Sequence, residues 1–434
     1  MTIRDHQGHV LTGAGADAAE SYRRALHSYH CYAGDAIGEA DAAIASCPAF
    51  TMAHLLKAYM HILGTNQEAA GVGAAAYEAA RALPANDRER GHADAIGALL
   101  SGEMRKAARI LEDVSIDYPR DVLALQVGQV LDFFLGDQRM LRDRIGRALP
   151  AWSRDMPDYH AVLGLLAFGL EETGQYAQAE DVGREAVALE PRDNWAQHAV
   201  AHVLEMQDRR KEGVAWMRSE ATGWQAESFF AVHNWWHTAL FHLGLGETDE
   251  AVKLYDGPIY GQVSTFALDL VDAAALLWRL HLKGVDLGAR WDTLADAFES
   301  EPRGLYAFDD AHAMLAYVGA GREAAQREVL DRQAAALAGP GDNAYFVSEV
   351  GLPVMRAIQA FGREDYARTV ELLRGVRNKA VRYGGSNAQR DLLDLTLIEA
   401  ARRAGQSALH RALLAERETA RPKPTRSAAR LAAE

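Results

Sequence analysis

Two short segments near the middle of the chain concentrate histidine and tryptophan, residue types well suited to binding and catalysis. The first places His198 and His202 four residues apart, and Glu205 follows three residues later. On a helix, side chains spaced by three or four residues share one face. Neutral imidazoles bind zinc, copper or iron, and histidine also transfers protons near neutral pH. This segment therefore predicts either one edge of a metal site or a general acid and base.

The second segment begins at His233 and continues Asn-Trp-Trp to His237. Indole rings can stack on a bound ligand, and imidazole and amide groups can hold it by hydrogen bonds. A ligand pocket is therefore the competing interpretation. Each histidine taken alone could equally be an ordinary buried or solvated residue, since the chain contains 16 of them.

A repeat of helix-breaking residues indicates which elements position these side chains. Prolines recur 34 to 38 residues apart, the period of tetratricopeptide helix pairs, at Pro48, Pro84, Pro119, Pro157 and Pro191. Asp208 occupies the turn of one unit, and in the other units the turn glycines are Gly64, Gly102, Gly136, Gly174, Gly246, Gly284, Gly321, Gly362 and Gly405. A helix ends before proline, and glycine permits the turn between two helices.

This repeat predicts an all-α fold, a tetratricopeptide-type solenoid of about nine to ten helix pairs that curl into a superhelix. Ala, Leu, Glu and Arg dominate the composition, and these residues favour helices. We expect an N-terminal extension over residues 1–15, one solenoid domain over 16–420 and a flexible basic tail over 421–434. The first helix of each pair should line the concave surface of the solenoid.

The repeat register predicts which side chains face that concave surface. When the turn residue is counted as position 15, the inward positions of the first helix are 2, 5, 9 and 12. In two consecutive units these positions hold polar or aromatic side chains, namely Trp195, His198, His202 and Glu205, then His233 and Trp236. Trp235 falls on a packing position instead. The register therefore predicts that both segments converge on one concave site.

We expect this site to bind a small polar or aromatic ligand or a peptide end. The side chains expected to bind it are Trp195, His233, Asn234, Trp236, Asp269, Asp272, Arg279, Gln389 and Arg390. The alternative is an enzyme that acts by metal-assisted or histidine-based hydrolysis or proton transfer, with catalytic candidates His198, His202, Glu205 and His237. Its metal, zinc or a similar transition metal, would bind His198, His202 and Glu205, although the chain contains no His-Glu-x-x-His motif. A third hypothesis is a plain protein-interaction scaffold.

Two further groups allow either a functional or a structural interpretation. The first is an acidic pair and an arginine on one helix face, Asp269, Asp272 and Arg279. These could form a buried carboxylate–guanidinium pair between repeats or contact a ligand. The second is the sequence Gly-Gly-Ser-Asn-Ala-Gln-Arg-Asp at 384–391, which predicts a loop entering a helix with Ser386 or Asn387 as the N-cap. Such a loop could also cradle an anion.

Three motifs together resemble those of the tetratricopeptide repeat protein 38 family: His-Ala-Val-Ala-His-Val-Leu-Glu-Met, His-Asn-Trp-Trp-His-x-Ala-Leu-Phe-His and Gly-Gly-Ser-Asn-Ala-Gln-Arg-Asp. The resemblance covers about residues 20–420 and implies a tetratricopeptide fold without a settled activity. It also implies a set of characteristic positions without giving their roles, namely His198, His202, Glu205, His233, Asn234, Trp235, Trp236, His237, Asp269, Asp272, Trp278, Arg279, Gln389, Arg390 and Asp391.

Composition and charge limit the partners. The chain has 60 acidic and 46 basic residues and a formal net charge of -14, which disfavours nucleic acid and anionic membranes as partners. Residues 1–15 lack the apolar core of a signal peptide, and no later apolar stretch is long enough to span a bilayer, so we expect a cytoplasmic protein. Cys31 and Cys47 match no metal or redox spacing, and we interpret both as small buried hydrophobic residues.

Overall fold

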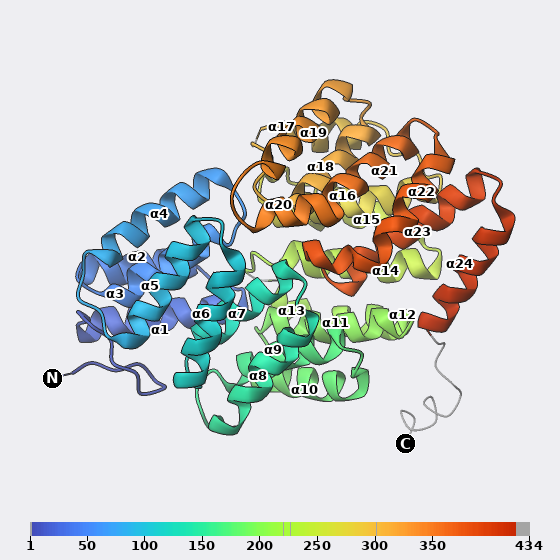
Figure 1. The fold of residues 1–434 in the computed structure, drawn as a ribbon. Helices are drawn as coiled ribbons and strands as arrows, with labels where there is room; N and C mark the ends of the chain where they lie inside the picture. The colour runs from blue at the N-terminus through green and yellow to red at the C-terminus, as the bar shows by residue number, and fades with distance from the viewer. Residues whose placement is uncertain (1, 220, 226, 301, 422–434) are drawn as a thin grey trace, which may run out of the picture. The chain divides into compact units, whose positions relative to one another are not determined.

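The computed structural model of the chain describes residues 2–219, 221–225, 227–300 and 302–421. Helices make up the secondary structure of these residues, apart from one isolated β-bridge near the N-terminus. Most helices follow one another as pairs joined by short turns (Figure 1). The predicted all-α fold of tetratricopeptide-type helix pairs is therefore confirmed.

The helices group into two compact units. The first unit contains Met1–Val200, Glu220–Ala231 and Pro340–Asp342. Its helices are α1 (Ala16–Cys31), α2 (Ala36–Ser46), α3 (Thr51–Ile62), α4 (Gln67–Arg81), α5 (Asp87–Leu100), α6 (Met104–Asp117), α7 (Val122–Leu135), α8 (Gln138–Ala148), the short 3₁₀ helix η1 (Leu149–Ala151), α9 (Tyr159–Glu172), α10 (Tyr176–Leu189), the first part of α11 (Asn194–Met206) and α13 (Ala221–Trp224).

The second unit contains Ala201–Ser219, Val232–Gly339 and Asn343–Glu434. Besides the rest of α11 it includes α12 (Arg210–Ser219), α14 (Ala231–Leu245), α15 (Thr248–Leu254), the π-helical turn η2 (Tyr255–Ile259), α16 (Ala267–Leu282), α17 (Arg290–Glu299), α18 (Ala307–Gly319), α19 (Glu323–Leu337), α20 (Asp342–Phe346), a second π-helical turn η3 (Val347–Gly351), α21 (Leu352–Gly362), α22 (Tyr366–Val376), the 3₁₀ segment η4 (Arg377–Tyr383), α23 (Asn387–Arg403) and α24 (Ser407–Ala420). That residues 16–420 form a single solenoid domain stays a prediction. Of the predicted tail, all but Arg421 lies outside the described residues.

Left-handed residues join the helices of most pairs. The predicted turn glycines with positive φ are Gly102, Gly136, Gly174, Gly246, Gly284, Gly321 and Gly405. Asp208 has φ 58° and so does take the place of a glycine. Near Gly64 and Gly362 the left-handed residue is instead Thr65 (φ 52°) and Glu364 (φ 61°). The repeat is therefore maintained by a backbone conformation that glycine favours but other residues also adopt.

Close packing between successive helices buries the apolar faces. Nearly every residue of α9 is buried, which is expected for a helix that is apolar on all sides. Small residues let its neighbour α10 approach, since Ala179 and Ala186 are fully buried. A Cβ atom added at Gly183 would lie 2.7 Å from a methyl carbon of Val200. These small side chains set the spacing of α9, α10 and α11 in the first unit.

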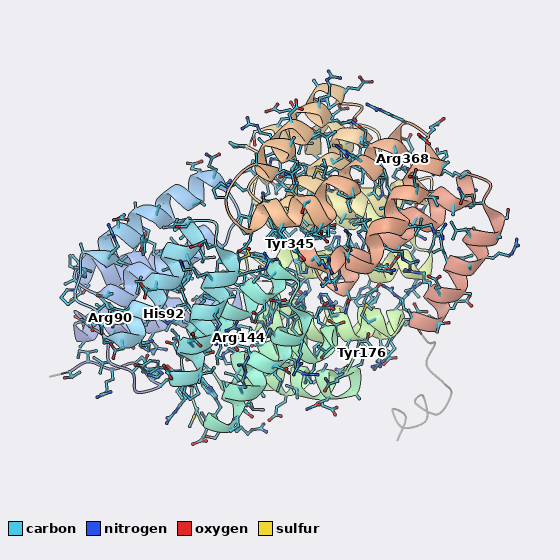
Figure 2. The ribbon with its side chains drawn as sticks, in the orientation of Figure 1. Arg90, His92, Arg144, Tyr176, Tyr345 and Arg368 are labelled. Carbon is cyan, nitrogen blue, oxygen red and sulfur yellow. The ribbon has the colours of Figure 1, made fainter. Side chains whose placement is uncertain are left out.

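Buried ionic pairs connect neighbouring helices of the first unit. One member of each of two such pairs, His92 and Arg144, is labelled in Figure 2. Arg144 binds Asp132 through two hydrogen bonds of 2.7 and 2.9 Å. A Cβ atom at Gly128 would lie 2.7 Å from the guanidinium carbon of Arg144, so the glycine makes room for it. His92 lies on α5, and its Nε2 donates to Asp121 at 2.9 Å. All four side chains are buried, so these pairs lie in the interior of the helical stack.

Two further properties of the described residues are the hydropathy of the helices and the state of the cysteines. Among the described residues, no helix is both long enough and apolar enough to cross a membrane. Both cysteines are free thiols; Cys31 is buried and Cys47 is half-buried.

Candidate functional site

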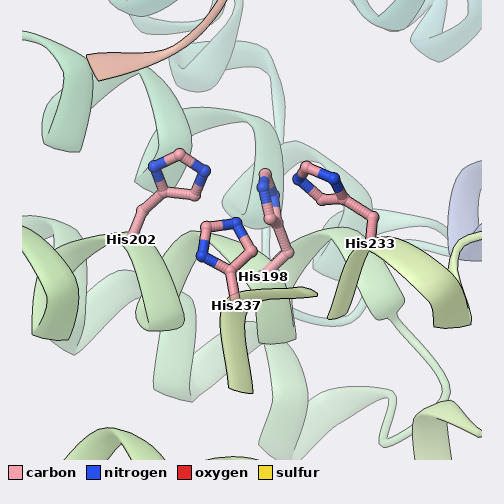
Figure 3. Close-up of side chains that lie close together, drawn as sticks. All are labelled: His198, His202, His233 and His237. Carbon is pink, nitrogen blue, oxygen red and sulfur yellow. The ribbon is translucent and has the colours of Figure 1, made fainter. Parts of the chain in front are cut away.

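Helices α11 and α14 bring four histidines together. His198 and His202 lie one turn apart on α11, and His233 and His237 lie one turn apart on α14. One ring nitrogen of each imidazole lies within 4.8 Å of those of the other three (Figure 3). All four residues are at most 5% exposed. The two segments singled out in the sequence therefore meet at one place.

The boundary between the two compact units falls inside α11, after Val200. Because α11 is one continuous helix, its own geometry fixes His198 relative to His202. His202, His233 and His237 all belong to the second unit. The site therefore consists of these three histidines and of His198, which joins them through its helix.

The imidazoles of the second unit pack on one another and on Trp236. The ring centroids of His202 and His237 are 4.5 Å apart, and those of His233 and His237 are 4.9 Å apart. Trp236 stacks on His233 with centroids 5.3 Å apart and an angle of 17° between the ring planes. On the same indole, the guanidinium carbon of Arg279 lies 5.3 Å from the ring centroid. Trp236 is fully buried, so its indole supports the imidazoles from within the core.

Asp272, on α16, orients His233. Nδ1 of His233 lies 2.8 Å from Oδ2 of Asp272, and both side chains are buried. When the carboxylate accepts the Nδ1 proton, Nε2 is the unprotonated nitrogen of the ring. Burial raises the pKa of Asp272, an effect that the charge of His233 opposes. A histidine that ligates a metal is commonly held by a carboxylate in this way.

Burial keeps the other two imidazoles neutral. It lowers the pKa of His202 well below its ordinary value, and the charges of His233 and Arg390 lower that pKa further. Burial also lowers the pKa of His237 well below its ordinary value, and His202, His233 and Arg279 add to the effect. At neutral pH each of these rings therefore has one unprotonated nitrogen, which is the form that binds a metal ion.

Glu205 belongs to a separate ionic network at the end of α11. Its Oε1 accepts a hydrogen bond of 3.1 Å from Arg421, which also lies 3.2 Å from Asp391. Asp391 in turn accepts a hydrogen bond of 2.8 Å from Arg417 on α24. The carboxylate of Glu205 therefore faces arginines, whereas the two histidines of α11 face α14. Arg421 is 9% exposed, although the sequence places it in a flexible tail.

The acidic pair and the arginine of α16 have different roles. Asp272 binds His233, whereas Arg279 donates a hydrogen bond of 2.7 Å to the carbonyl oxygen of Ala388. Burial raises the pKa of Asp269 to about 6 and lowers the pKa of Arg279 to about 10. The carboxylate–guanidinium pair considered from the sequence is therefore replaced by a histidine–carboxylate pair and by a tie between α16 and α23.

Ser386 is the N-cap of α23, one of the two caps considered from the sequence. Its hydroxyl accepts a hydrogen bond of 3.2 Å from the backbone N–H of Gln389, whose Oε1 accepts one of 2.9 Å from the N–H of Ser386. Gly384 and Gly385 precede the cap with φ values of 87° and 79°. Arg390 donates to the carbonyl oxygen of Gly385. Two side chains expected to bind a ligand, Gln389 and Arg390, thus build the loop itself.

Trp195 and Asn234, also expected to bind a ligand, lie in packed surroundings. Trp195 stacks on Tyr32 in the first unit, with centroids 5.3 Å apart and planes inclined by 16°. Its ring centroid is also 4.8 Å from that of Phe168, which stacks on His198. Asn234 is fully buried. The aromatic residues around His198 therefore hold that ring in place.

A cavity of 330 Å³ lies in the second unit, between α23 and α24 and the end of α11. Its walls include Met206, Arg390, Asp391, Arg417 and Arg421. Its described lining contains no histidine. This cavity is therefore separate from the group of histidines.

A second group of possible metal ligands lies wholly in the first unit and was missed from the sequence. His27 and Cys31 on α1 meet His160 on α9, with one ligand-capable atom of each within 4.8 Å of the others. The four-residue spacing of His27 and Cys31 was the available signal. His160 comes from a distant helix, so local spacing could not indicate it.

Comparison with protein-family models gives no match. Among solved structures, the chain is similar to the crystal structure of the APC/C hetero-tetramer Cut9–Hcn1, with a TM-score of 0.40 and 12% sequence identity, over 88% of this chain and 76% of that chain.

Proposed function

We propose that this protein binds one transition-metal ion, zinc by preference, through His202, His233 and His237, with His198 as the fourth ligand. The observation that carries the proposal is the convergence of four buried imidazoles, one nitrogen atom of each lying within 4.8 Å of those of the others. Zinc takes four nitrogen or sulfur ligands in tetrahedral geometry. The ion would connect α11 to α14 and so stabilise the second unit.

A metal ion suits this group better than the small organic ligand expected from the sequence. The four histidines are at most 5% exposed, and the cavity described above is lined by other residues. Protonated imidazoles would be destabilised by burial and by one another. Burial keeps His202 and His237 neutral, and neutral imidazoles in contact supply the lone pairs that zinc requires.

The number of protein ligands separates a binding role from catalysis. Four protein ligands close a zinc site, whereas a catalytic zinc keeps one position for water or substrate. We therefore infer that the ion stabilises the fold. This inference depends on His198, because His198 is the fourth protein ligand that closes the site. A three-histidine site that lacked His198 would instead have the ligand set of a hydrolytic zinc centre.

The test is the metal content of the full chain, purified without a histidine tag and exposed to zinc before excess ion is removed. The double variant His202→Ala/His237→Ala should carry one zinc ion fewer per chain than the wild type while its circular dichroism stays helical. His410→Ala, which changes a histidine of α24 outside the group, should keep the wild-type zinc content. Equal zinc content in the double variant and the wild type would overturn the proposal.

We also infer that the chain belongs to the tetratricopeptide repeat protein 38 family, because the site contains the histidines and tryptophan of two of the motifs that carry the resemblance. A cytoplasmic location is consistent with the two free thiols. Fractionation of cells that express the untagged chain tests the location.

A further inference from the structure

We infer a second metal site of a different kind in the first unit, where Cys31, His27 and His160 hold a zinc-like transition-metal ion and Glu190, which lies beside His27, can supply a fourth ligand. This site goes beyond the proposed function, because none of its ligands belongs to the histidine group on α11 and α14. A thiolate, two imidazoles and a carboxylate form a donor set that zinc accepts.

Helix α1 supplies two of the ligands. His27 and Cys31 are four residues apart on it, so their side chains lie on one face. Nε2 of His27 lies 3.8 Å from Sγ of Cys31 and 3.6 Å from Oε2 of Glu190, which follows α10. The contact with Sγ has the length of a long hydrogen bond to sulfur, and the contact with Oε2 exceeds an ordinary N–H···O hydrogen bond. Both distances are close to the separation of about 3.3–3.6 Å expected for two ligands of one tetrahedral zinc ion with bonds of about 2.0–2.3 Å.

His160 supplies the third ligand and is already oriented for it. Its Nδ1 lies 2.8 Å from Oδ2 of Asp193, and the carboxylate accepts the Nδ1 proton. Nε2 is then left with its lone pair, and it has no hydrogen-bond partner in the part of the chain that the structure describes. The residue is only 7% exposed. A buried imidazole nitrogen without a partner is costly, and a metal ion would satisfy it.

Access to this group favours an ion over an organic substrate. Cys31 is 1% exposed, so its thiol is too deeply buried to attack a substrate. The His27 side chain is 35% exposed, and the carboxylates of Asp158 and Glu190 lie within 3.8 Å of its ring nitrogens. A small cation can therefore enter past His27 through an acidic opening. On binding, the thiol proton is released to water and a metal–sulfur bond forms.

The first unit also contains a matched histidine that lacks these neighbours. His92 binds Asp121 at 2.9 Å, just as His160 binds Asp193. The hydroxyl of Tyr59 lies 3.2 Å from the other ring nitrogen of His92, so that nitrogen is satisfied within the protein. A purely structural role would make the two histidines equivalent. A metal site makes His160 different from His92.

Cobalt(II) is the probe, because a cobalt–thiolate bond gives a near-ultraviolet charge-transfer band that a nitrogen-only site does not give. The full chain, freed of metal and titrated with cobalt(II), should show this band at one equivalent per chain. Cys31→Ser should abolish the band and weaken binding at this site at least tenfold, while Cys47→Ser should leave both unchanged. His160→Gln should also lose the band, whereas His92→Gln should keep it.

The two metal proposals fail in different ways. The double variant His202→Ala/His237→Ala should keep the cobalt–thiolate band, since its changes lie in the other unit. The second site is overturned if the wild type gives no such band, if Cys31→Ser keeps it or if Cys47→Ser loses it. Should His160→Gln fail to fold, the near-isosteric change Cys31→Ser still decides the question.

Discussion

Asp193 caps helix α11 with one carboxylate oxygen and holds His160 with the other. Its Oδ1 accepts a hydrogen bond of 2.8 Å from the backbone N–H of Ala196, and its Oδ2 lies 2.8 Å from Nδ1 of His160. Asp121 is placed in the same way at the start of α7, where its Oδ1 accepts the N–H of Ala124 at 3.0 Å. One carboxylate thus both begins a helix and ties it to a histidine of an earlier helix pair.

Changing these two carboxylates should destabilise the first unit to different extents. Asp193→Asn keeps an oxygen for the helix cap but weakens the bond to His160, and should cost about 1–3 kcal/mol. Asp121→Asn also removes the carboxylate that binds Arg88 at 2.8 Å, so a buried guanidinium loses its counter-charge and the cost should reach about 3–5 kcal/mol. Urea unfolding with an unchanged m-value measures both. Equal losses would contradict the role given to Arg88.

Asp272 should strengthen the binding of the metal ion by the histidine group without changing the number of ions bound at saturation. Asp272→Asn removes the carboxylate that orients His233, and the zinc dissociation constant should rise about 10–100-fold with one ion still bound at saturation. Competition with a chromophoric chelator gives the constant. Asp269→Asn, on the same helix but without that bond, is the matched control and should change the constant by less than about threefold. An equal effect of the two changes would show that general charge, and not orientation, matters.

The stability of the second unit should fall as pH rises through the range in which Asp310 ionises. Burial raises the pKa of this carboxyl from 3.8 to about 7. Between these values the folded state binds more protons than the unfolded state, so the contribution of Asp310 is fully present below about pH 4 and is lost by about pH 7. Asp310→Asn should remove this slope, at most about 1.4 kcal/mol per pH unit. Denaturant unfolding across this range is the measurement, and parallel pH profiles would contradict it.

Substitution of the left-handed turn residues should change the stability of the protein only through backbone strain, and not through side-chain contacts. Gly174 has φ 81°, and a Cβ atom there would meet nothing within 4 Å, so Gly174→Ala should destabilise by about 1–2 kcal/mol. Glu364→Gly relieves the strain of φ 61° and should be neutral or stabilising by up to about 1 kcal/mol.

Gly146 is the control for these turn substitutions. It lies inside α8 with similar free space, so Gly146→Ala should stabilise by up to about 1 kcal/mol. Thermal unfolding of all three variants checks the signs. Destabilisation by Gly146→Ala would mean that crowding, and not φ, explains the loss at Gly174.

The helix pairs could be predicted because proline and glycine affect the backbone locally, at the ends of helices and in the turns between them. Asp208 was assigned to a turn by position alone, and its φ of 58° confirms the assignment. The turn residue was misplaced near Gly64 and Gly362, where Thr65 and Glu364 take the left-handed conformation. Such residues tolerate that conformation at a modest cost, so their types give no local signal.

Contacts between helix pairs could be predicted only in part, where the repeat register indicated that the segments around His198 and His233 converge. The helical period indicated that His198 and His202 share a face, and the register placed His233 and Trp236 at the inward positions of the next unit. The partner of His233 is Asp272, 39 residues away, and the partner of Glu205 is Arg421, 216 residues away. These pairings depend on how helices stack, which spacing along the chain does not encode. For the same reason the proximity of Cys31 to His160 could not be predicted.

The contact between Arg421 and Glu205 also bears on how the chain is made. These residues are 216 positions apart, so at about 5–20 residues per second a ribosome completes Arg421 roughly 10–40 s after Glu205. Through that interval the carboxylate at the end of α11 lacks the guanidinium that neutralises it. The second unit can therefore form this ion pair only after Arg421 has been synthesised, and a chain stopped within α24 would leave that charge unmatched.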